Sequence, residues 1–144
     1  MKMVTCDRPD RRALLLILSL AAVYSLAASC ELFWLLGREE LFLAQQSAQP
    51  NLSYGDFQQF LLLRFWGGLI PVITLAGYAY WGWPRFGLRR FGTGVFVLIL
   101  TYTLMTQLLE LRLDSIFYYL RSLSLIGLIL TVLNARRLSQ TATR

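Results

Sequence analysis

Apolar and polar positions fall into long blocks along this chain. Four apolar blocks of roughly 20 residues each are separated by polar segments, and that length lets an α-helix cross a hydrocarbon core of roughly 30 Å. The pattern therefore predicts an all-α integral membrane protein, folded as an antiparallel four-helix transmembrane bundle. The predicted spans are residues 13–36, 57–81, 92–109 and 115–133.

The composition supports the same class and argues against several kinds of site. Of the 144 residues, 56% are hydrophobic and 14% are aromatic, which leaves too few polar side chains to coat a soluble domain. Histidine is absent and the two cysteines, Cys6 and Cys30, are far apart. These features predict no metal site, no cofactor and no thiol oxidoreductase. No nucleophile has a base beside it, so we expect no enzyme.

Basic residues are concentrated on one side of the predicted spans. The tail 1–12, the loop 82–91 and the tail 137–144, together with Arg136 at the membrane edge, hold ten of the 14 lysines and arginines. The positive-inside rule then places the N and C termini in the cytoplasm. Because orientation explains these charges, we expect the lipid bilayer and not a nucleic acid as their partner.

The outer loop, residues 37–56, is the largest predicted segment outside the spans. Residues 39–46 are compatible with a short helix on the membrane surface. Asp56, with Gln59 three residues later, predicts an N-cap at the start of the second span.

Cys30 raises the alternative of a processed lipoprotein signal. The apolar run continues past this cysteine as LFWLL, and it is longer than the 7 to 15 residues typical of a cleaved signal. This favours an uncleaved first helix over processing at Cys30.

Five charged or amide side chains are predicted to share one layer of the membrane, within roughly 10 Å of its outer boundary. They are Glu31, Arg64, Gln107, Glu110 and Arg121. A charged side chain at the centre of a span costs about 2.5 to 3.5 kcal/mol, so opposite charges are expected to meet inside the bundle. We predict the pairs Glu31–Arg64 and Glu110–Arg121. Such pairs would hold the helices together, bind a proton or cation at Glu31, or meet charges of a partner.

The second span contains the sequence RFWGGLIPV. Pro71 has no N–H to donate to the carbonyl of Gly67, which predicts a kink at this point. Gly67 and Gly68 would allow a neighbouring helix to approach closely. A packing kink and a gating hinge are both consistent with this sequence.

In topology the chain resembles small four-span bacterial inner-membrane proteins that have no assigned activity, which implies a multi-pass location in that membrane. A second comparison is with the small multidrug resistance transporters. Those are four-span proteins with a membrane glutamate in the first helix, and here Glu31 and Tyr24 would be the matching residues. That family does not bury arginines such as Arg64 and Arg121, and it has shorter loops.

These observations lead to two hypotheses about function. The first is a non-catalytic accessory or interaction protein, whose partner is another membrane protein or a second copy of the chain. The second is a proton-coupled transporter of a small molecule or cation that uses Glu31.

Overall fold

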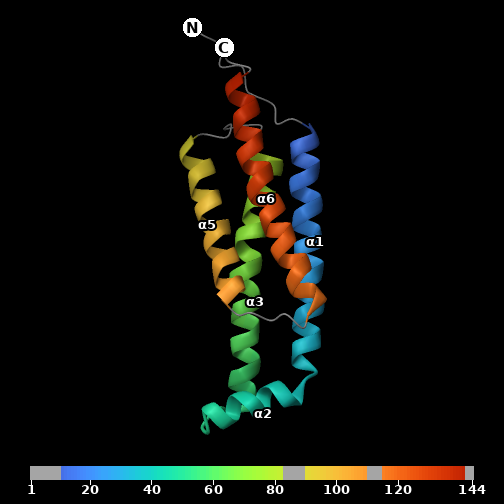
Figure 1. Ribbon diagram of the computed structural model, residues 1–144, viewed down its shortest axis with the longest axis vertical. Coiled ribbons are helices and arrows are strands. Elements are labelled where there is room, and N and C mark those ends of the chain that lie inside the picture. The colour runs from blue at the N-terminus through green and yellow to red at the C-terminus, as the bar shows by residue number, and fades with distance from the viewer. Residues whose placement is uncertain (1–10, 83–89, 110–114, 142–144) are drawn as a thin grey trace.

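The computed structural model describes residues 11–82, 90–109 and 115–141. These residues form five α-helices and no strand (Figure 1). The helices are α1 (Arg11–Leu36), α2 (Glu39–Ala48), α3 (Tyr54–Gly77), α5 (Arg90–Leu109) and α6 (Ile116–Thr141), and a π-helical turn, η1 (Tyr78–Gly82), continues α3. Four of them, α1, α3 with η1, α5 and α6, are long and apolar enough to cross a membrane. The prediction of an all-α bundle with four spans is confirmed.

The observed helices differ from the predicted spans mainly at one end. The ends of α1, α3 with η1 and α5 lie within three residues of the predicted limits. By contrast, α6 continues to Thr141, eight residues beyond the predicted limit at residue 133. Its apolar part ends near Ala135, and the hydropathy pattern detects only that part.

The four long helices run side by side, with alternating directions (Figure 1). Helix α1 begins and α6 ends at the same end of the bundle, while α2 lies across the opposite end. The most extensive packing joins α1 to α6, so the first and last spans are neighbours. The contact between α3 and α5 is the least extensive around the ring.

An apolar core fills the middle of the bundle. All four spans contribute fully buried side chains: Ile17, Tyr24, Val72, Ala79, Leu100, Leu125, Leu128 and Val132. Where α6 packs against α1, a Cβ on Gly127 would lie 3.0 Å from a methyl carbon of Leu20. Glycine at this position therefore lets the two helices pack closely.

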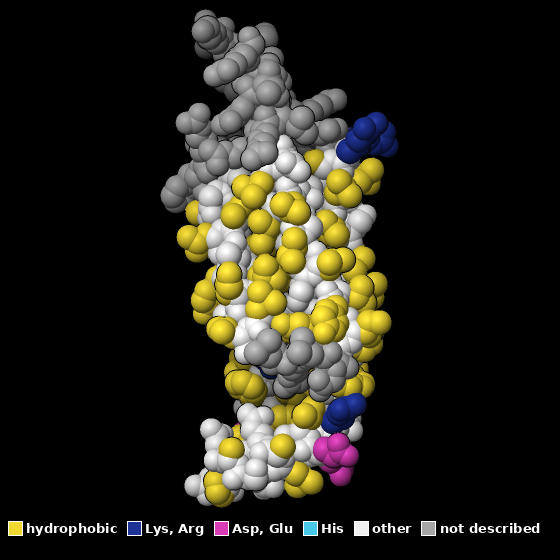
Figure 2. Space-filling view, viewed as in Figure 1, with side chains coloured by type: hydrophobic (Ala, Val, Ile, Leu, Met, Phe, Trp, Pro, Cys, Tyr) yellow, Lys and Arg dark blue, Asp and Glu magenta, His cyan; other side chains and the backbone are white. Residues whose placement is uncertain are grey.

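The outer surface of the bundle is apolar, as a lipid-facing surface requires. Figure 2 shows hydrophobic side chains along the body of the bundle, with charged side chains gathered towards its two ends. Hydroxyl groups in the spans donate to carbonyls of their own helix, for example Ser25 to Ala21 at 2.8 Å and Thr131 to Gly127 at 2.7 Å. These bonds satisfy the hydroxyl groups without any need for water.

Helix α2 and the adjoining ends of α1 and α3 form a separate small core, here called the collar. Its buried residues are Leu35, Phe57 and Leu61, and packed against them are Leu32, Trp34, Leu36, Leu41, Phe42 and Leu52. The rings of Phe42 and Tyr54 meet edge to face at 5.2 Å, and the Tyr54 hydroxyl donates to the Leu36 carbonyl at 3.3 Å. The expected short helix is therefore present and packs against the spans, while its position on the membrane surface stays a prediction.

The N-terminus of α3 corrects one prediction. The N-cap is Ser53, and Asp56 occupies the third helical position. The Ser53 hydroxyl accepts from the Asp56 N–H at 3.2 Å, and the Asp56 carboxylate accepts from the Ser53 N–H at 3.3 Å. The capping box thus begins three residues earlier than predicted, because serine supplies the cap and the aspartate completes it.

Candidate functional site

The centre of the polar layer is an ion pair between the first and last spans. Nη1 of Arg121, on α6, donates to Oε2 of Glu31, on α1. The side chain of Glu31 is 2% exposed and that of Arg121 is 11% exposed. Because the carboxylate is almost fully buried, the guanidinium bound to it compensates its charge.

Tyr24 completes this group of polar side chains. It lies on the same face of α1 as Glu31, seven residues earlier. Nη2 of Arg121 donates to the Tyr24 hydroxyl at 3.3 Å, and the guanidinium carbon lies 5.3 Å from the centre of the Tyr24 ring. That distance is within the range of cation–π attraction. Tyr24 is fully buried, so its hydroxyl depends on Arg121 for a partner.

Gly68 on α3 provides the space for this arrangement. A Cβ at this position would lie 2.7 Å from the Tyr24 hydroxyl oxygen and 3.4 Å from Nη2 of Arg121. Any side chain on Gly68 would therefore displace the tyrosine. The neighbouring Gly67 differs, because a Cβ there would meet nothing within 4 Å.

The observed pair differs from the predicted one. We expected Glu31 to bind Arg64 and Arg121 to bind Glu110, but Glu31 binds Arg121. The reason is the order of the helices around the ring, in which α6 is the principal neighbour of α1. Arg64 lies on α3 and lines a space beside the pair. Glu110 is outside the described residues.

Gln107 joins α5 to α6 within the same layer. Its Nε2 donates to the Tyr118 carbonyl at 3.3 Å and to the Ser122 hydroxyl at 3.2 Å. The residue is buried, and its Oε1 has no hydrogen-bond partner among the described residues. The polar layer therefore connects α5 to α6 and α6 to α1.

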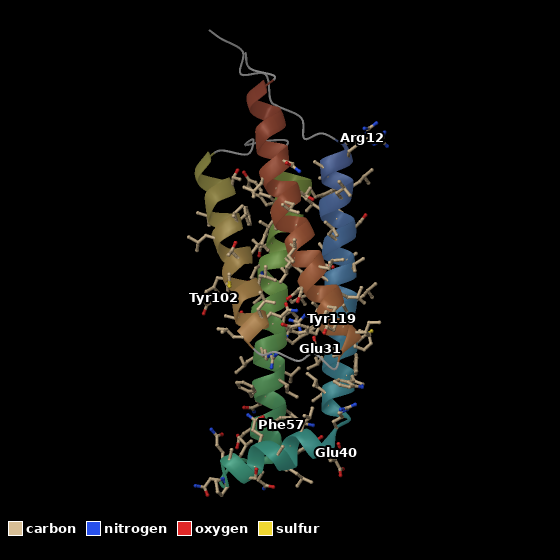
Figure 3. The ribbon with its side chains drawn as sticks, in the orientation of Figure 1. Arg12, Glu31, Glu40, Phe57, Tyr102 and Tyr119 are labelled. Atoms are coloured by element: carbon tan, nitrogen blue, oxygen red, sulfur yellow. The ribbon has the colours of Figure 1, made fainter. Side chains whose placement is uncertain are left out.

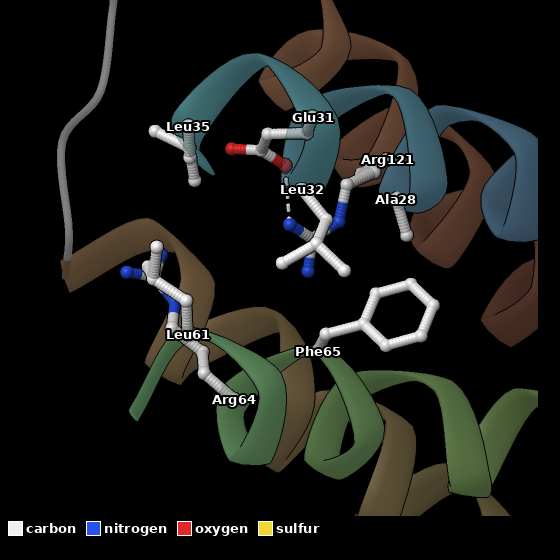
Figure 4. Close-up of a pocket in the computed structure, with 8 residues that line it drawn as sticks. All are labelled: Ala28, Glu31, Leu32, Leu35, Leu61, Arg64, Phe65 and Arg121. Atoms are coloured by element: carbon white, nitrogen blue, oxygen red, sulfur yellow. Dashed lines mark hydrogen bonds and ion pairs between the residues drawn. The ribbon is translucent and has the colours of Figure 1, made fainter. Parts of the chain in front are cut away.

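Two cavities of very different size adjoin the polar layer. The smaller one, about 20 Å³, lies between α1, α3 and α6 and is lined in part by Glu31, Arg64 and Arg121 (Figure 4). Figure 4 shows Glu31 and Arg121 joined across this space, with Leu61, Arg64 and Phe65 of α3 facing them. A cavity of this volume is large enough for about one water molecule.

The larger cavity, about 400 Å³, lies between α3 and α5. Its α3 wall includes all three residues that the sequence suggested as a kink or hinge, namely Gly67, Gly68 and Pro71. Its α5 wall comprises Ile99, Tyr102, Thr103, Thr106 and Gln107. Helix α3 continues through Pro71 to Gly77. The kink at Pro71 remains a prediction.

Both arginines line the larger cavity, but Glu31 does not. Among the described residues, the carboxylate lines the small space instead, where it lies beside Arg121 (Figure 4). Within the described ranges, no three His, Cys, Asp or Glu side chains come close enough together to hold a metal ion. The chemistry that the site offers is hydrogen bonding and charge pairing.

Sequence reasoning missed two features of this site. It treated Gly67 and Gly68 as one pair, whereas only Gly68 faces a neighbouring side chain. It also did not identify the hydrogen-bond partners of Gln107. These partners are Tyr118 and Ser122 on α6. The sequence did hold a signal for these partners: Tyr118 and Ser122 are four residues apart, which places both on one helical face.

Comparisons with protein-family models, with curated proteins and with solved structures gave no match to this chain. The resemblance to four-span membrane proteins therefore rests on topology, and the resemblance to small multidrug resistance transporters rests on Glu31 and Tyr24.

Proposed function

We propose that this chain is a non-catalytic accessory protein of the bacterial inner membrane, with both termini in the cytoplasm, which binds another membrane protein. The observation that carries the proposal is the position of Glu31. This carboxylate is 2% exposed, is paired with Arg121 and borders a space of about 20 Å³. Its ion pair with Arg121 stabilises the packing of α1 against α6.

A transporter that uses Glu31 is less well supported by this geometry. Such a protein must bring its substrate or proton to the carboxylate from each side of the membrane in turn. Among the described residues, the space that Glu31 lines has room for about one water molecule. A guanidinium already bound to the carboxylate also competes with a cationic substrate for it.

The collar supports the choice of a binding role. A surface groove of about 360 Å³ lies on it, lined by Glu39, Phe42, Leu43 and Tyr54. Leu43 is 59% exposed although it stands on a helix outside the candidate spans. Aromatic and apolar side chains beside an acidic one suit an apolar partner segment that carries a lysine or arginine.

Native mass spectrometry after mild detergent extraction tests this role. The wild-type chain should carry a partner of defined mass, and Leu43→Glu should lose that partner because it places a charge in the groove. Ala44→Glu is the matched control, since it adds the same charge to an exposed position of α2 that does not line the groove.

Two results would overturn the accessory role. One is a wild-type chain that leaves its native membrane as a lone monomer under conditions that preserve known complexes. The other is equal loss of the partner in both variants, which would show that charge on α2 and not the groove matters. A partner with the mass of the chain itself would identify a homo-oligomer.

A further inference from the structure

The cavity between α3 and α5 has no part in the accessory role, yet it has the size of a ligand site. Its volume of about 400 Å³ falls within the roughly 300 to 1,000 Å³ of pockets that hold small molecules. Gly67, Gly68 and Pro71 form part of its α3 wall, and a Cβ on Gly67 would meet no neighbouring atom within 4 Å.

Two residues in the wall of this cavity have unsatisfied polar atoms. Oε1 of Gln107 and Nε of Arg121 are buried and lack a hydrogen-bond partner among the described residues. The first is an acceptor and the second is a donor. Buried polar groups are normally paired, so each unpaired atom calls for an explanation.

The charge of the wall is also distinctive. Arg64 and Arg121 both line the cavity, and no carboxylate does so among the described lining residues. Guanidinium groups bind phosphate oxygens well because their donors are fixed in one plane. The wall therefore suits a ligand that has an anionic group and also a hydrogen-bond donor for Gln107.

The cavity opens sideways, towards the lipid. Its lining residues Gly67, Tyr102 and Thr106 are exposed, and Tyr102 projects from the edge of the bundle (Figure 3). Neighbouring positions on the same helices carry exposed apolar side chains, such as Leu63 at 72% and Leu98 at 70%. A ligand entering here would come from the bilayer.

The depth of the cavity also fits a lipid headgroup. Gln107 lies two residues before the end of α5 at Leu109, which is about 3 Å along the helix axis. On the α5 side, the polar wall is thus close to the end of the described helix.

We propose that this cavity binds the headgroup of a phospholipid from the leaflet on the α2 side. A phosphate oxygen accepts a hydrogen bond from Nε of Arg121, and a hydroxyl or ammonium group of the headgroup donates to Oε1 of Gln107. The acyl chains lie against the exposed apolar side chains of α3 and α5. Both polar atoms are shielded from solvent, so a small rotation of the two side chains accompanies binding.

This arrangement predicts a preference among headgroups. Phosphatidylethanolamine and phosphatidylglycerol each carry a donor, an ammonium N–H or a hydroxyl. Phosphatidylcholine has the same phosphate, but its quaternary ammonium has no hydrogen to donate. A site that hydrogen-bonds its ligand discriminates against an analogue that leaves a buried group unpaired.

The test is native mass spectrometry of the full chain in a mild detergent, titrated with these three lipids carrying identical acyl chains. We expect phosphatidylethanolamine or phosphatidylglycerol to bind about tenfold more tightly than phosphatidylcholine. Gly67→Leu should weaken that binding at least tenfold, because it fills the mouth of the cavity. Gly77→Leu is the matched control, since it too adds a side chain to α3 in open space, away from the cavity.

Three results would overturn the proposal: equal binding of all three lipids, equal effects of the two leucine variants, or no lipid bound at all. The same titration is repeated with water-soluble glycerophosphoethanolamine, which has the headgroup but no acyl chains. If it bound as tightly as the intact lipid, the site would belong to a soluble phosphate ester and the lipid assignment would be wrong. Should Gly67→Leu fail to fold, Thr106→Leu fills the same mouth from α5.

Discussion

The guanidinium of Arg121 binds the carboxylate of Glu31 and so fastens the last span to the first, across a sequence separation of 90 residues. This contact requires the first and last spans to lie side by side. The same guanidinium donates to Tyr24, so one side chain satisfies two polar groups of α1. The stability of the bundle should therefore depend strongly on Arg121.

A double-mutant cycle measures this dependence. Glu31→Leu and Arg121→Leu should each lower the free energy of unfolding by about 3 kcal/mol, because each leaves the other charge buried without its partner. The double variant should recover a large part of the combined loss. Unfolding in detergent micelles, followed by circular dichroism, gives the four values.

The control for this cycle is Arg38→Leu, which replaces an exposed arginine that stacks on Trp34. Combined with Glu31→Leu, it should give simple additivity, since Arg38 is not bound to Glu31. Additivity in the Glu31 and Arg121 cycle itself would contradict the pairing.

Adjacent glycines on α3 should respond in opposite ways to alanine. Gly68→Ala should be destabilising by about 1 to 3 kcal/mol, since its Cβ would meet the Tyr24 hydroxyl. Gly67→Ala should be neutral or stabilising by up to about 1 kcal/mol, because its Cβ points into open space and alanine favours a helix. Thermal unfolding of the two variants provides the comparison.

Tyr24→Phe tests whether the Tyr24 hydroxyl oxygen causes the loss of stability in Gly68→Ala. In the Gly68→Ala background it removes the oxygen that the new methyl group would meet, so it should restore part of the lost stability. In the wild-type background it should instead cost about 1 kcal/mol, by removing the hydrogen bond with Arg121. The same sign in both backgrounds would show that Gly68 does not make room for Tyr24.

The capping box at the start of α3 should contribute measurably to the order of that helix end. Ser53→Ala removes the hydroxyl that accepts from Asp56 and should cost about 1 kcal/mol. Hydrogen exchange in the first turn of α3 should rise accordingly. Ser47→Ala is a suitable comparison, because that hydroxyl bonds within α2 and caps no helix. An equal rise in hydrogen exchange in both variants would contradict the capping role of Ser53.

Proton-coupled flux separates the accessory role from a transporter. In proteoliposomes with an internal pH-sensitive dye, the wild type and Glu31→Gln should give the same background rate for cationic dyes and drugs. The physical reason is that Glu31 is paired with Arg121, and the space that it lines among the described residues, about 20 Å³, is too small for such a molecule. Flux that is present in the wild type and lost in Glu31→Gln would establish the transporter instead.

The fold was largely predictable because hydropathy reports which residues lie in the membrane. It placed the end of α5 at Leu109, where the structure also has it. It ended the fourth span at residue 133, because five of the six residues from Arg136 to Thr141 are polar and a polar stretch of helix leaves no hydropathy signal.

The pairing was not predictable, because depth along a helix does not specify its neighbour. Arg64 and Arg121 come at similar depths on two spans that run in the same direction, so either could reach Glu31. The choice depends on the close packing of α1 with α6, to which the contact between Gly127 and Leu20 contributes. Such a contact involves residues far apart in sequence and has no local pattern.

The unequal lengths of the spans have a consequence for the surrounding bilayer. Among the described residues, the candidate span of α3 with η1 has 29 residues and that of α5 has 18, or about 43 Å and 27 Å of helix. Lipids around the molecule thus meet a tall flank on one side and a low flank on the other. Hydrophobic mismatch costs a fraction of a kcal/mol per Å, so tilting of the whole bundle or local thinning of the membrane beside α5 would relieve it.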